Sequence, residues 1–210
     1  MPRRFCGLYP SDKAKGDMKF AIELFMMLQI TEQAAMDAWE WPDIHRLQAA
    51  IGWLELGAFS EANQELEKIT PQLRSHPSFL KILWAVYARS GCWAAALVAA
   101  ITSAAVAPDE PQPWLNLAFS LDQLNHTREA RDNLLAVAGR FPESGWLRYS
   151  LACYESKLGN LAEARNWLLE ALASSAGEEL SAFALQDSDL APVWATFWSF
   201  VPAFHAPIRN

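Results

Sequence analysis

The sequence predicts an all-α protein, a helical solenoid of about four 34-residue helix-turn-helix repeats with a capping helix at each end. A glycine or asparagine recurs at one constant interval, at Gly57, Gly91, Asn125 and Gly159. An alanine recurs five positions further on at the same interval, at Ala62, Ala96, Ala130 and Ala164. This constant period, about 34 residues, is typical of repeat proteins. Leu and Ala are abundant and few stretches alternate apolar and polar residues, so no sheet is expected.

Each column of the repeat has a physical reason. Glycine, and asparagine next best, accepts the left-handed backbone at which one helix ends and the chain reverses into the next. The alanine lies where the two helices of a repeat cross closely, so a larger side chain there would overpack the crossing. Pro108 and Pro142, which are separated by the same interval, end the second helices of two repeats.

These columns divide the chain into a repeat array and two flanks. The array covers 43–178, with repeats at 43–76, 77–110, 111–144 and 145–178. Residues 1–16 are expected to be a mobile basic tail, and 17–42 an N-terminal helix and cap. The N-terminal helix could instead bind a client, dimerise, or occupy the groove as a self-inhibitor, because its methionines are adaptable side chains.

The last segment, 179–210, is expected to be a C-terminal capping helix and tail. A helix-start pattern lies around Asp187, and apolar side chains then follow at helical spacing from Leu190 to Trp198. Such a helix would cover the apolar face that the final repeat leaves exposed. Most tryptophans, such as Trp53 and Trp84, fall on packing faces and are expected to be core rather than a ligand cage.

The repeats resemble the tetratricopeptide repeat (TPR) family, a family of stacked 34-residue helix-turn-helix units. The repeat at 111–144 matches the family pattern most fully, through Trp114, Leu117, Ala118, Ala130, Leu134 and Pro142. The resemblance covers 43–178 and implies a right-handed superhelix whose concave wall is formed by the first helix of each repeat. It also implies protein binding in that groove.

The resemblance nominates groove residues by their position in the first helix of each repeat. The partner-binding groove so predicted is lined by Leu47, Ile51, Lys81, Ala85, Arg89, Gln112, Asn116, Phe119, Trp146, Tyr149 and Lys157. A peptide or helix with apolar anchors and acidic residues would suit this wall. The alternative for each side chain is a solvated or packing role. A dedicated chaperone clamp is not expected, because Ala85 stands where the clamp needs an asparagine.

Charge and cysteine content exclude several other classes. The net charge is −7, with a local +3 in residues 1–19 and −10 in the remainder. This acidic body argues against nucleic-acid binding, which needs clustered Lys and Arg. Three cysteines without ligand spacing indicate neither a disulfide framework nor a metal site and favour a cytoplasmic protein. The apolar run at 20–30 is too short for a membrane span.

No catalytic constellation is recognisable, and no cofactor is expected. The four histidines are scattered, and no nucleophile elbow, phosphate-binding loop or zinc-protease motif is present. The sequence therefore favours a non-catalytic protein-protein interaction module, an adaptor, scaffold or chaperone, with a protein or peptide client. The alternative is a self-associating structural subunit of a homo-oligomer, including a homodimer formed through the N-terminal helix.

Overall fold

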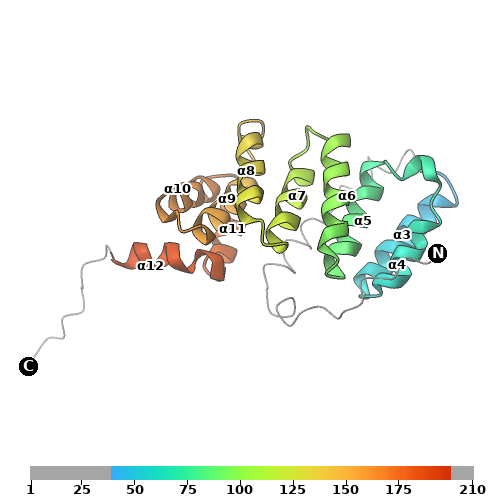
Figure 1. The fold of residues 1–210 in the computed structure, drawn as a ribbon, viewed down its shortest axis with the longest axis horizontal. Helices are drawn as coiled ribbons and strands as arrows, with labels where there is room; N and C mark the ends of the chain where they lie inside the picture. Colours follow the sequence, from blue (N-terminus) through green and yellow to red (C-terminus); the bar gives the residue numbers. More distant parts are fainter. Residues whose placement is uncertain (1–38, 200–210) are drawn as a thin grey trace, which may run out of the picture. The chain divides into compact units, whose positions relative to one another are not determined.

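The computed structural model describes residues 39–199, with side chains as far as Thr196. Every regular element in this range is a helix and none is a strand, which confirms the predicted all-α fold class (Figure 1). The expected tail at 1–16 and most of the expected N-terminal helix at 17–42 lie outside the described residues. The chain forms two compact units, unit 1 ending at Ala130 and unit 2 beginning at Arg131.

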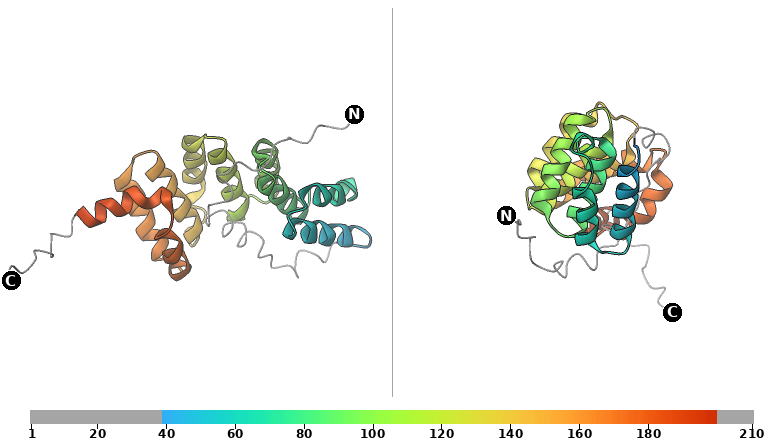
Figure 2. Two further views of the ribbon diagram at one scale, coloured as in Figure 1. Left: turned by 90° about the horizontal axis from the view of Figure 1, so that it is seen from below. Right: turned by 90° about the vertical axis from the view of Figure 1, so that its right-hand side faces the viewer.

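Unit 1 is a series of antiparallel helix pairs. Its elements are α3 (Asp43–Glu55), α4 (Phe59–Glu67), the short 3-10 helix η2 (Pro71–Leu73), α5 (Pro77–Arg89), α6 (Trp93–Val106), α7 (Pro111–Gln123) and the beginning of α8 (Thr127–Ala138). α3 packs on α4 and α5 packs on α6, while α5 also contacts both α3 and α7. Figure 2 shows these pairs from two further directions.

The first helices of successive pairs begin at the same constant interval as the turns. α3 begins at Asp43, α5 at Pro77 and α7 at Pro111, and in unit 2 α9 begins at Gly145. Proline suits the first position of α5 and α7, because its missing N–H would have no partner there and its φ is already helical. The local sequence therefore sets where each pair starts.

Unit 2 contains the end of α8, then α9 (Gly145–Lys157), α10 (Leu161–Leu172), α11 (Gly177–Ala184), the 3-10 helix η3 (Ser188–Leu190) and α12 (Ala191–Ser199). α11 adds to the single capping helix that the sequence predicted. It forms because Leu180 and Ala184 lie on one face and are fully buried against α9 and α10.

The turns between paired helices have the predicted backbone. Gly57, Gly91 and Gly159 have φ of +74°, +73° and +84°, and Asn125 has +66°. These are the left-handed values that glycine accepts without strain and asparagine accepts better than other side chains. The four repeat-defining alanines are all fully buried. Both columns of the repeat thus do what their spacing predicted.

Side chains at the helix ends hold the linking segments. Asp43 at the start of α3 accepts hydrogen bonds from Thr70 Oγ1 (2.6 Å to Oδ2) and from Thr70 N (3.0 Å to Oδ1). The Thr70 hydroxyl contact is the main reason that the pKa of Asp43 is lowered from its usual value. His76 caps α5, its Nδ1 accepting from Ser78 N at 3.2 Å. The segment that follows α4 is therefore hydrogen-bonded to α3 through Thr70 and to α5 through His76.

Most tryptophans among the described side chains are packing residues, but Trp41, which is 75% exposed, and Trp53 are not. Trp84 is buried and donates through Nε1 to Ser120 Oγ at 2.9 Å, which links α5 to α7. Trp53 instead remains 40% exposed on α3, so the expectation that it belongs to the core is wrong.

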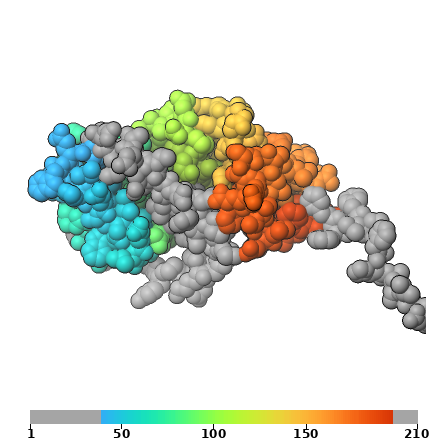
Figure 3. All heavy atoms as spheres, turned by 180° about the vertical axis from the view of Figure 1, so that it is seen from behind, coloured from blue at the N-terminus to red at the C-terminus, as the bar shows by residue number. Residues whose placement is uncertain are grey.

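In the space-filling view the blue to cyan atoms of α3 and α4 form one continuous surface (Figure 3).

Candidate functional site

One face of α5 combines two cations with small residues. Lys81, Ala85, Ala88 and Arg89 follow the i, i+4, i+7, i+8 pattern of a single helix face. Lys81 and Arg89 are half-buried, while the two alanines between them are buried. The face therefore carries a positive charge towards each end, and the alanines between the two cations are covered by neighbouring residues.

Helices α3 and α7 flank this face, because both contact α5. We define the α5 surface as these α5 residues together with the predicted groove residues of the two neighbours, Leu47 and Ile51 on α3 and Gln112, Asn116 and Phe119 on α7. Ile51 and Gln112 are half-buried, whereas Leu47, Asn116 and Phe119 are buried. The accessible parts are thus Ile51, Gln112 and the two cations.

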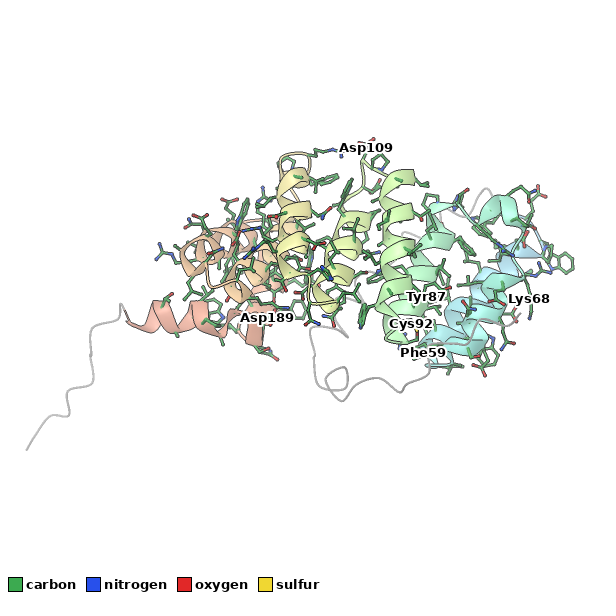
Figure 4. All side chains as sticks on the ribbon, viewed as in Figure 1. Phe59, Lys68, Tyr87, Cys92, Asp109 and Asp189 are labelled. Atoms are coloured by element: carbon green, nitrogen blue, oxygen red, sulfur yellow. The ribbon has the colours of Figure 1, made fainter. Side chains whose placement is uncertain are left out.

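Arg89 has the most informative surroundings. Its guanidinium carbon lies 5.7 Å from the centre of the ring of Phe59, which is the first residue of α4. Burial lowers the pKa of the Arg89 guanidinium, and the nearby carboxylate of Glu55 acts in the opposite direction. Among the described residues, no carboxylate forms an ion pair with Arg89. Phe59 and Cys92 mark this end of α5 in Figure 4.

This arrangement makes Arg89 a suitable anion-binding group. The guanidinium has lost part of its hydration and is held over an aromatic face, which restricts its orientation. A carboxylate that reached it would form a charge-assisted, bidentate hydrogen bond, one of the stronger polar contacts available to a protein surface.

The α7 side of the surface is held by packing and hydrogen bonds. Gln112 donates through Nε2 to Asn116 Oδ1 at 2.9 Å. The Phe119 ring lies edge-on to Trp84 and Trp93, with centroid distances of 6.4 and 5.4 Å. Phe119 is therefore a packing residue that fixes α7 against the α5–α6 pair, and Gln112 is the α7 side chain best placed to meet a partner.

In unit 2, the predicted groove residues have different environments. Tyr149 is only 1% exposed and donates its hydroxyl to Asp187 Oδ2 at 2.6 Å. Trp146 packs on Tyr149 and on Phe183 of α11, with ring centroids 5.7 Å apart in each case. Both rings belong to the core of unit 2, because η3 and α11 fold back onto α9. Lys157 is exposed at the end of α9.

Two partners of the nominated residues were missed by the sequence analysis. Phe59 carries a recognisable signal, since it follows the turn at Gly57 and lies one repeat before Trp93. Asp187 also carries a local signal, because aspartate often forms an Asx turn with the residue two positions on. Its side chain does accept a hydrogen bond from Asp189 N, at 2.9 Å. Their contacts with Arg89 and Tyr149 join residues that are far apart in the sequence, and no local pattern indicates such pairs.

Residues 39–199 contain neither a candidate metal site nor a candidate membrane span. No cluster of three or more His, Cys, Asp or Glu side chains in this range is placed to hold a metal ion. No helix in the same part of the chain has the length and apolar character needed to cross a membrane.

Comparisons with known proteins support the fold. No protein-family model matches the sequence, and no curated protein sequence matches it significantly. Solved structures of MamA, a TPR-like helical protein, are similar. MamA MSR-1 superposes with a TM-score of 0.53 at 20% identity, covering 73% of this chain and 85% of that chain. MamA AMB-1 gives 0.52 at 20% identity, with 73% and 81% covered.

A point mutant of MamA gives a TM-score of 0.51 at 19% identity, covering 73% of this chain and 86% of that chain. At this level of identity the similarity concerns the fold. Together with the helix pairs and their left-handed turns, it shows that the chain has a TPR-like helical repeat fold.

Proposed function

We propose that this protein is a non-catalytic interaction module that binds an apolar and acidic helix or peptide of a partner protein on the α5 surface. The observation that carries the proposal is Arg89, half-buried over the Phe59 ring and without an ion pair among the described residues. A cation desolvated in this way gains more from a partner's carboxylate than a fully hydrated one does.

The spacing of the two cations describes the partner further. Lys81 and Arg89 are eight positions apart, which is about 12 Å along a helix. Ile51 on the neighbouring α3 is an accessible apolar side chain of the same surface. A partner helix with apolar side chains on the α5 side and carboxylates about two turns apart would satisfy both features.

The fold is compatible with this role. TPR-like repeats present helix faces to partners, and specificity depends on the side chains of each site. The proposal therefore rests on the chemistry of Arg89 and Lys81 and has to be tested at these residues.

Affinity capture from a lysate with matched charge variants tests the proposal. The test variant is Lys81→Glu with Arg89→Glu. The control is Lys68→Glu with Arg128→Glu, the same charge change at two exposed positions of unit 1. The proposal expects a protein that is retained by the wild type and the control and lost by the test variant. Equal retention by all three chains would contradict it.

A second function, self-association, is favoured by the outer face of α6. This helix has no charged residue, and Val98, Ile101 and Val106 are exposed on it. Interface cores are depleted of charge, and two copies of a chain of net charge −7 repel each other wherever charged faces meet. The α6 face is a place where a second copy can pack without that repulsion.

Light scattering after size exclusion separates this second function from the first. Self-association predicts that the wild type is a dimer and that Ile101→Lys converts it to a monomer. The control Leu135→Lys, which changes an exposed apolar residue on α8, should leave the dimer intact. A wild-type chain that is monomeric at micromolar concentration would exclude it.

A further inference from the structure

Helix α6 differs from the other second helices of the repeats because it carries no charge. Each of α4, α8 and α10 contains charged residues, whereas none lies within Trp93–Val106. The difference is clearest at Val98, which is 64% exposed. The same position in the other three repeats is exposed and polar, as Gln64, Asp132 and Asn166. A helix that is apolar on its outer as well as its inner face is usually covered by another element.

The exposed side chains along the middle of this face form one stripe. Four exposed residues follow one another at intervals of four, three and four positions: Ala94, Val98, Ile101 and Ala105. This is the spacing of the core positions in a pair of packed helices. The stripe reads the same in size from both ends, namely small, large, large, small. A second α6 that runs in the opposite direction therefore matches it layer by layer, because each residue meets one of similar size.

Charges beyond the end of α6 favour this antiparallel direction. Asp109 and Glu110 are exposed just after the helix ends. In a parallel pair, the carboxylates of both copies would meet at one end and repel each other. In an antiparallel pair they are separated by about 21 Å, the length of a 14-residue helix. They then lie beside the N-terminal end of the other α6, where the helix dipole is positive and no side chain caps the helix.

We propose that two copies of this chain pair through antiparallel contact of their α6 helices, about a two-fold axis that passes between Ala99 and Ala100. Ala94 of each copy then lies opposite Ala105 of the other, and Val98 lies opposite Ile101. This inference rests on the proposed self-association and adds the direction and register of the contact. Because both copies use the same surface, the assembly closes at two chains and does not extend into a filament.

Two charge variants test the register by complementation. Ile101→Lys and Val98→Glu each place a charge in the stripe at an exposed position, so circular dichroism should show unchanged helix content. Each variant alone should be monomeric in size exclusion with light scattering, because its charge would be buried without a partner. Their mixture should form a heterodimer, because the introduced lysine faces the introduced glutamate. The control mixture, Ile101→Lys with Ala105→Glu, should stay monomeric, because these positions are about 10 Å apart along the proposed pair.

Disulfide formation gives an independent readout. The three native cysteines are replaced by serine, and light scattering checks that this chain is still a dimer. Ala94→Cys is then introduced into one such chain and Ala105→Cys into another. Oxidation of the equimolar mixture should give a cross-linked dimer. Neither chain should cross-link alone, because equal positions of the two copies are about 16 Å apart along the helices.

Several results would overturn the inference and leave self-association standing. They are cross-links within either cysteine chain alone, a dimer that the cysteine mixture does not cross-link, or charge variants that do not combine. A wild-type chain that is monomeric at micromolar concentration would overturn self-association together with the inference. None of these experiments changes Lys81 or Arg89, so partner binding on the α5 surface is tested separately.

Discussion

Replacing Ala96 by leucine should destabilise unit 1 through the crossing of α5 and α6. Ala96 has no exposed surface and lies five positions after the left-handed turn at Gly91, where the two packed helices are close. Leucine adds three carbon atoms that have no space at this position. Overpacking of this kind costs about 1–3 kcal/mol. For a chain of this size, that corresponds to a melting temperature about 2–12 °C lower.

The matched control is Ala94→Leu, the same change on an exposed face of the same helix. It should alter the free energy of unfolding by no more than about 0.5 kcal/mol. Urea denaturation followed by far-ultraviolet circular dichroism measures both chains. If Ala96→Leu were as stable as Ala94→Leu, the assignment of the alanine column to close helix crossings would be refuted.

Three further predictions concern turns, caps and a buried contact. Burial lowers the pKa of His76, so the contribution of this side chain to stability is present above about pH 6.5 and is lost as the pH falls. Between about pH 7.5 and 5.5, the melting temperature of the wild type should therefore fall relative to that of His76→Asn, which keeps a capping acceptor. Parallel curves of melting temperature against pH would contradict this. Gly91→Ala should cost about 1–2 kcal/mol because of its φ of +73°, whereas Gly139→Ala, at an open site, should not destabilise. Asp187→Asn and Tyr149→Phe should each cost about 1–3 kcal/mol, and urea denaturation of the double variant should show less than the sum.

The repeat could be predicted from the sequence because its signals are local. A left-handed turn requires glycine or asparagine whatever surrounds it, and a close crossing requires a small side chain. Asn125 is the clearest example, since its φ of +66° follows from its place in the glycine column. The additional helix α11 was missed because its short sequence gives a weak periodic signal, and its burial against α9 and α10 decides its formation.

The candidate site was predictable only in part. Position in the first helix of each repeat places Lys81, Ala85 and Arg89 on one face of α5, since this follows from helical geometry; that a partner binds there stays a prediction. The same rule nominated Tyr149, which is buried because the chain after α11 returns to α9 and supplies Asp187. Such a return is a tertiary event, and no pattern within 145–157 indicates it.

The most direct test of the proposed function is a calorimetric titration of the captured protein, once purified, into three chains. These are the wild type, Lys81→Glu with Arg89→Glu, and the control Lys68→Glu with Arg128→Glu. Loss of two charge-assisted contacts should weaken the affinity of the test variant at least about tenfold, with the control unchanged. Equal dissociation constants for all three chains would contradict the assignment of the α5 surface as the partner-binding site.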